Sequence, residues 1–150
     1  MRALFLLGRS LFGGFFVYSG LNHFLQTEHM SQYAASKGVP SPHTLVRSSG
    51  GMLLTGGISV LAGVKPRQGL ATLVAFLVPT TLQMHRFWEI EDPNQRMAEM
   101  SQFAKNVALI GAALALMQTD EPWPLSIDAA RREEEMFVRI GGRDLRSLPA

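Results

Sequence analysis

The chain has 150 residues, enough for one domain, of which 47% are hydrophobic and only 17% charged, against roughly a quarter charged in soluble domains. Cysteine is absent, which excludes disulfides, thiol catalysis and cysteine-ligated metal centres. The net charge of +2 comes without a basic arm, so no nucleic-acid partner is expected.

The charges are placed unevenly along the chain. Residues 48–64 and 68–84 form two uncharged runs of 17 residues, separated only by Lys65-Pro66-Arg67. Each run is just long enough to cross a hydrocarbon core of about 30 Å. This pattern predicts an integral membrane protein.

The first predicted span covers residues 3–21 and is apolar except for Arg9. Because Arg9 interrupts the apolar run and no small-x-small cleavage site follows, we expect a retained helix and not a signal peptide. A charge at this depth is expected to be buried inside the bundle, where backbone carbonyls, Tyr18 or the Ser59 hydroxyl could receive it.

Three further spans are predicted at residues 45–64, 68–83 and 103–118, with a short helix at residues 30–37. The fold class is therefore all-α: a four-helix transmembrane bundle in residues 1–118. A polar, partly helical tail follows in residues 119–150, and its helix is expected to end at Gly141-Gly142.

Small residues recur every four positions in three of the spans. The stripes are Gly51, Thr55, Ser59 and Gly63; Ala71 and Ala75; and Ala104, Ala108 and Ala112. Such stripes are typical of helix-packing faces. Pro79 is expected to kink the third span, with Thr80 and Thr81 helping to satisfy the freed carbonyls.

Because the chain reverses direction at each span, the polar residues near alternate helix ends converge on one membrane face. They are Asn22, His23, Arg47, Ser48, Ser49, Gln83, His85, Arg86, Glu89, Lys105 and Asn106. Residues Asn22, His23, Arg47, Gln83, His85, Lys105 and Asn106 are the candidate ligand-binding set. No residue is assigned a catalytic role.

In this polar layer Arg47, Arg86 and Lys105 outnumber the acids Glu28 and Glu89, which favours an anionic or carbonyl-bearing ligand. His85 and Glu89 are four residues apart, so both are expected on one helix face.

A simpler interpretation stands beside this one. Long basic side chains at helix ends extend to the lipid headgroups, and Phe87, Trp88 and Trp123 are typical interfacial anchors. Arg86 is expected to point outward in this way, whereas for Arg47 and Lys105 the inward and outward placements are equally compatible with the sequence. The histidines lack the close spacing of a metal or haem site, so neither cofactor is expected.

Lysine and arginine counts predict the orientation of the chain. Eight basic residues accompany the termini: Arg2, Lys65, Arg67, Arg131, Arg132, Arg139, Arg143 and Arg146. The opposite face holds fewer, so both termini are expected in the cytoplasm of a bacterial-type cell, with the spans in the inner membrane.

The order and spacing of several motifs resemble the DoxX family. These motifs are LGRSLFGGFFVYSGLNHF, YAASKGVP, GGMLLTGGISVLAG, VPTTLQMHRFW and QRMAEMSQFAKNVALIGAALAL. The resemblance runs from about Leu4 to Gln118. The resemblance implies a small four-helix membrane protein associated with redox enzymes and quinones. It singles out the family-like positions Arg9, Asn22, His23, Lys37, His85, Trp88, Lys105 and Asn106.

The leading functional hypothesis is a non-catalytic accessory subunit of a quinone-linked membrane redox system. Its polar layer would bind a quinone headgroup or a partner enzyme, with Arg47, His85 and Lys105 as donors to the quinone carbonyls. The alternatives are a small-molecule transporter, with Pro79 as a hinge, and a membrane scaffold. A homo-oligomer is compatible with each of these hypotheses.

Overall fold

The computed structural model describes residues 2–144, and it confirms the all-α class. Arg146 and the other residues of 145–150 lie outside the described part of the chain. The elements are α1 (Arg2–Leu25), α2 (Thr27–Ser36), α3 (Pro42–Ala62), α4 (Pro66–Met84), the 3-10 turn η1 (Phe87–Glu89), α5 (Pro93–Met117) and α6 (Ile127–Asp144).

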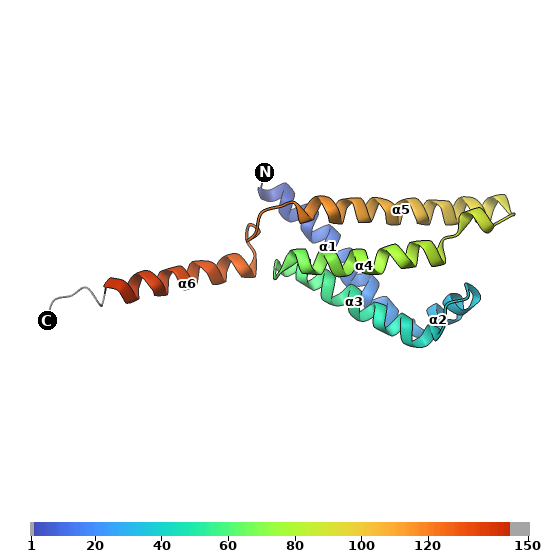
Figure 1. Ribbon diagram of the computed structural model, residues 1–150, viewed down its shortest axis with the longest axis horizontal. Helices are drawn as coiled ribbons and strands as arrows, with labels where there is room; N and C mark the ends of the chain where they lie inside the picture. Colours follow the sequence, from blue (N-terminus) through green and yellow to red (C-terminus); the bar gives the residue numbers. More distant parts are fainter. Residues whose placement is uncertain (1, 145–150) are drawn as a thin grey trace.

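Four long helices run back and forth through the body of the molecule (Figure 1). Helix α3 packs on α1 and on α4, and α4 packs on α5. The ends of α1 and α4 therefore meet the starts of α3 and α5 at one end of the bundle, where α2 and η1 also lie (Figure 1). We call this the site end, and the opposite end, where residues 118–126 cross the bundle, the tail end.

Local sequence explains where the long helices begin and end. Pro42, Pro66 and Pro93 each stand in the first turn of a helix, where no backbone N–H is needed. Gly63 ends α3 in the left-handed conformation, with φ of 65°. Asp92 caps α5 by accepting a 2.8 Å hydrogen bond from the backbone N–H of Gln95.

Two pairs of glycines bring α1 and α3 into close contact. A Cβ added to Gly13 would lie 3.0 Å from the carbonyl oxygen of Gly57, and one added to Gly57 would lie 2.9 Å from that of Gly13. Gly20 and Gly50 form a second reciprocal pair. The predicted stripe is therefore only partly right: Ser59 and Gly63 contact other segments, whereas Gly51 has open space beside it and Thr55 is exposed.

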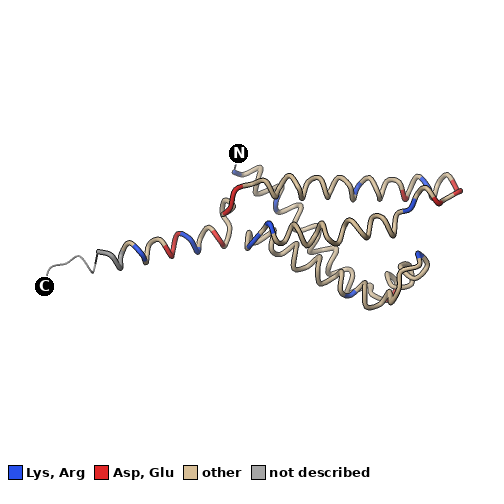
Figure 2. Tube along the Cα trace, viewed as in Figure 1, with Lys and Arg blue, Asp and Glu red and all other residues tan. Residues whose placement is uncertain are grey.

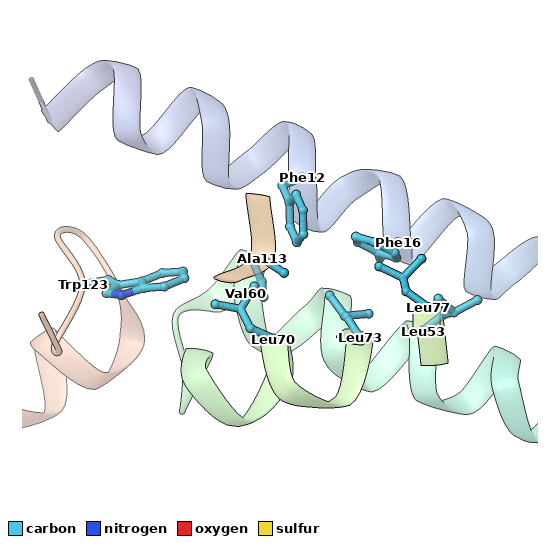
Figure 3. Close-up of a cluster of buried hydrophobic side chains, with 9 residues drawn as sticks. All are labelled: Phe12, Phe16, Leu53, Val60, Leu70, Leu73, Leu77, Ala113 and Trp123. Carbon is cyan, nitrogen blue, oxygen red and sulfur yellow. The ribbon is translucent and has the colours of Figure 1, made fainter. Parts of the chain in front are cut away.

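The hydrophobic core lies between the long helices and extends into the tail end. Phe12 and Phe16 of α1 face Val60, Leu70 and other buried side chains of α3 and α4 (Figure 3). Trp123 joins the same core, fully buried, with its ring 5.3 Å from that of Phe5 in an edge-to-face arrangement. Its prediction as an interfacial anchor is wrong, because residues 119–126 fold back over the bundle.

Three helices, α1, α3 and α5, are long and apolar enough to cross a membrane by length and composition. Figure 2 shows charged positions mainly near the helix ends and along α6, with long uncharged stretches between them. Helix α4, which is 19 residues long, is not among the three. The fourth span is therefore not confirmed and stays a prediction.

The last helix differs from its predicted length. Helix α6 continues through Gly141 and Gly142 to Asp144 and projects away from the bundle (Figure 1). The expectation that these glycines end the helix is wrong, since glycine in a helix interior costs only about 1 kcal/mol relative to alanine. Met136, Phe137, Val138 and Ile140 of α6 are exposed.

Candidate functional site

The site end gathers part of the predicted polar layer. Asn22 and His23 lie in the last turn of α1, and Gln83 in the last turn of α4, all three half-buried. Lys105 and Asn106 are elsewhere, because α5 begins at Pro93 and both lie about three turns inside it. Their expected position at a helix start is therefore wrong.

One carboxylate organises the site end. Glu99, in the second turn of α5, accepts a 2.8 Å hydrogen bond from the Lys37 ammonium and a 3.0 Å bond from the Tyr33 hydroxyl. Its other oxygen lies 2.7 Å from Nδ1 of His85. We call Tyr33, Lys37, His85 and Glu99 the Glu99 cluster. It joins α2, the end of α4 and the start of α5.

The Glu99 cluster fixes the protonation of two of its members. Burial raises the pKa of Tyr33, and the hydrogen bond to Glu99 acts in the same direction. The hydrogen bond to Glu99 raises the pKa of Lys37, although burial acts against it. Tyr33 therefore keeps its proton as a donor, and Lys37 stays charged.

The predicted pairing of His85 with Glu89 on one helix face is wrong. Helix α4 ends at Met84, so His85 follows the last helical residue and turns toward Glu99. Glu89 pairs instead with Arg86, at 3.3 Å, on the exposed surface. Arg86 is half-buried in this pair, and its extension to the lipid headgroups stays a prediction.

Arg47 and Lys105 do not point inward. Arg47 is exposed, and its guanidinium carbon lies 5.7 Å from the centre of the Phe24 ring. Lys105 is exposed and donates to the side-chain oxygen of Gln102 in the preceding turn of α5. Asn106, beside it, is buried at 7% exposure. The described site end therefore lacks the inward-facing side chains of Arg47 and Lys105 that would favour an anionic ligand.

A cavity of about 750 Å³ lies next to the Glu99 cluster, between α2, α3 and α4. His23 of α1 reaches into it, and Tyr33 and Gln83 line it as well. Most of its wall is apolar, from side chains such as Met30, Met52 and Phe76. Of the seven candidate residues, two line the cavity, His23 and Gln83.

Gln83 also connects the cavity to the Glu99 cluster. Its side-chain amide donates a 3.0 Å hydrogen bond to the backbone carbonyl of Lys37, which itself binds Glu99. Tyr33 belongs both to the cavity wall and to the Glu99 cluster. The cavity and the cluster therefore form one continuous site.

At the tail end, Arg9 is buried, with 6% of its surface exposed. It donates hydrogen bonds of 3.2 Å to the carbonyl of Pro124 and 3.1 Å to that of Leu125. Backbone carbonyls were among the expected partners, but the tail was not considered as their source. Arg9 lies fourteen residues before His23 in α1, about 21 Å along the helix axis, and is not among the residues that line the cavity.

Glu99 is the main residue that sequence reasoning missed. The fourth span was predicted to begin at residue 103, so Glu99 fell into a connecting segment, and only Glu28 and Glu89 were weighed as nearby acids. The signal was present in Asp92-Pro93, a typical helix start. A helix drawn from Pro93 places Glu99 one turn before the apolar run.

In the described residues, no group of three histidine, aspartate or glutamate side chains is arranged to hold a metal ion. Apart from His23 and Tyr33, the side chains that line the cavity are not ionisable.

Comparison with known proteins gives one positive result. The DoxX family model matches residues 4–86, which comprise α1 to α4 and the following His85 and Arg86. No curated protein and no solved structure matches the chain. The motif of residues 95–116 that resembles the same family lies beyond this match. Because the match covers more than half of the chain and three helices are apolar enough to span a bilayer, this chain is a membrane protein of the DoxX family.

Proposed function

We propose that this chain is an accessory subunit of a quinone-linked membrane redox system, and that its cavity holds an apolar ligand with a small polar headgroup. The observation that carries the proposal is the cavity itself, about 750 Å³ in volume and mostly apolar, at one end of the bundle. Ligand sites commonly combine apolar walls with a few placed polar atoms.

The composition supports a binding role without independent catalysis. The chain has no cysteine to relay electrons, so a redox role would come from a bound molecule or from a partner enzyme. Membership of the DoxX family is consistent with this class of partner, as expected from the resemblance. The Glu99 cluster would hold α2 over the cavity.

The membrane arrangement belongs to the same proposal. We place α4 across the bilayer as a fourth span, with the tail end in the cytoplasm and the site end at the outer face of the inner membrane. The basic residues near the tail end support this orientation, among them Lys65 and Arg67 at the start of α4.

Filling the cavity tests the proposal. In Met52→Trp, an indole replaces a half-buried side chain of the cavity wall and should exclude a ligand. For the purified protein in detergent, we expect calorimetry with a decyl-tailed benzoquinone to show at least about tenfold weaker binding, a difference of about 1.4 kcal/mol.

The matched control is Thr55→Trp, one turn along α3 at an exposed position outside the cavity wall. This variant should bind the benzoquinone as the unmodified protein does. The proposal fails if the unmodified protein binds none, or if both tryptophan variants bind equally well.

A further inference from the structure

Several polar side chains of the cavity wall use hydrogen-bond donors within the protein, although the hydroxyls of Ser48 and Thr80 have no partner among the described residues. The Tyr33 hydroxyl donates to Glu99 at 3.0 Å, and the Ser49 hydroxyl donates to the carbonyl of Val46 at 2.8 Å. One N–H of the Gln83 amide donates to the carbonyl of Lys37 at 3.0 Å. These side chains keep oxygen lone pairs for a ligand.

The tautomer of His23 follows from the hydrogen-bond partner of its Nδ1 atom. Nδ1 of His23 lies 2.8 Å from the backbone carbonyl oxygen of Ser19. A carbonyl can only accept, so Nδ1 must carry the hydrogen. In the neutral imidazole, Nε2 is then the unprotonated nitrogen, an acceptor on the ring that lines the cavity.

The backbone of α4 adds a further acceptor. Pro79 has no N–H and cannot donate to the carbonyl of Ala75, four residues earlier, and both residues line the cavity. The Thr81 hydroxyl, expected to help satisfy the freed carbonyl, donates instead to Leu77 at 2.6 Å. The Ala75 carbonyl thus lacks its usual helical donor.

The absence of charged side chains from the cavity wall further restricts which class of ligand it can hold. No lysine, arginine, aspartate or glutamate lines the cavity, and the titratable residues of its wall are His23 and Tyr33. A buried ionic headgroup without a counter-charge would be strongly disfavoured. The cavity therefore does not suit the anionic ligand predicted from sequence, and a quinone carbonyl cannot donate to the acceptor nitrogen of His23.

We propose that the ligand enters as a neutral hydrogen-bond donor: a phenol or quinol whose hydroxyl donates to Nε2 of His23, with its apolar body against α3 and α4. The inference rests on the proposed function of the cavity and specifies which form of the headgroup it prefers. The reduced, hydroxyl-bearing form binds more tightly than the oxidised, carbonyl-bearing form.

Three probes that share one decyl tail test the preference: a benzoquinol, the corresponding benzoquinone, and the dimethyl ether of the quinol. Calorimetry under argon should show the quinol binding about tenfold more tightly than the other two, since those two leave the imidazole nitrogen without a donor. In His23→Phe the three affinities should converge to within about threefold, because the ring keeps its shape but loses Nε2.

His29→Phe is the matched control. His29 is exposed on α2 outside the cavity wall, so this variant should keep the tenfold preference. The inference is overturned if the quinone or the ether binds as tightly as the quinol, or if His23→Phe retains the preference.

Different results would contradict the cavity as the ligand site and the preference for a hydrogen-bond donor. If all three probes bind equally and Met52→Trp weakens all of them, the cavity is the ligand site and the donor preference is wrong. If no probe binds the unmodified protein, both are wrong.

Discussion

Arg9 shows how a membrane helix can contain a buried arginine about two turns from its start. Its guanidinium donates to two backbone carbonyls, of Pro124 and Leu125, while Trp123 lies fully buried in the adjoining core. A charge in a spanning helix is costly unless it is directed inward and hydrogen-bonded. Arg9 and residues 123–125 are therefore expected to depend on each other for their buried positions.

Arg9→Met should release the segment around Trp123, because the two carbonyls lose their donors. The chain has two tryptophans, and Trp88 is half exposed, so a Trp88→Phe background makes Trp123 the sole reporter. We expect its fluorescence emission to shift to longer wavelength in Arg9→Met.

Arg2→Met, which removes an exposed arginine from the same helix, should leave the emission unchanged. An unshifted spectrum in Arg9→Met would show that the core alone holds Trp123 in place.

At the scale of single residues, the sequence identifies which side chains are unusual but not their partners. Arg9 stands out within its apolar run, yet its partners lie 115 and 116 residues away. Glu99 was missed because its importance depends on where α5 begins. His23 was identified, whereas its tautomer follows only from the distance to the Ser19 carbonyl.

At the scale of the elements, the contact between α1 and α3 depends most clearly on particular residues. Gly13 and Gly20 in α1 are seven residues apart, as are Gly50 and Gly57 in α3, and each glycine meets the backbone of the other helix. Without side chains between them, the two backbones gain close van der Waals contact, which drives helix association where no hydrophobic effect operates.

Gly57→Ala should destabilise the bundle, because the new Cβ would lie 2.9 Å from the carbonyl oxygen of Gly13 and from the backbone nitrogen of Val17. We expect a loss of about 1–3 kcal/mol in the free energy of unfolding, the usual cost of overpacking. Denaturation in mixed micelles followed by circular dichroism measures it.

Gly51→Ala is the matched control in the same helix. Nothing lies within 4 Å of its added Cβ, so this variant should be neutral or more stable by up to about 1 kcal/mol. Equal stabilities of the two variants would contradict the proposed glycine contact.

The elements themselves were largely predictable, since apolar runs bounded by proline and glycine locate the four long helices. The packing faces were not. The four-residue repeat in the sequence predicted a contact through Gly51 and Thr55. Helix α3 instead contacts α1 through Gly50 and Gly57, which are seven residues apart. A sequence rich in small residues offers several such registers, and only the partner helix selects one.

For the whole molecule, alternating direction is the main organising rule. It correctly brings the ends of α1 and α4 together with the starts of α3 and α5 (Figure 1). The cavity could not be predicted from this rule, because its volume depends on how α2 covers the gap between α3 and α4.

The absence of cysteine makes the membrane crossing of α4 directly testable. Gln68→Cys, at the first residue of the uncharged run of α4, and Glu91→Cys, after that run, place single thiols at exposed positions. In sealed vesicles, a membrane-impermeant maleimide should label the two from opposite sides. Labelling of both from the same side would rule out the crossing.

Gln118→Cys, just after α5, provides the reference for the tail end. It should be labelled from the same side as Gln68→Cys, and in oriented inner-membrane vesicles that side should be the cytoplasmic one.

The bond between Arg9 and residues 124–125 has a consequence for the order of assembly. Ribosomes make α1 first and the carbonyls that receive its guanidinium more than one hundred residues later. While the chain is growing, Arg9 must be held by water, by lipid headgroups or by the insertion machinery. The first helix can therefore reach its final environment only after the segment following α5 has been synthesised. The bundle is complete only once this late segment has been made.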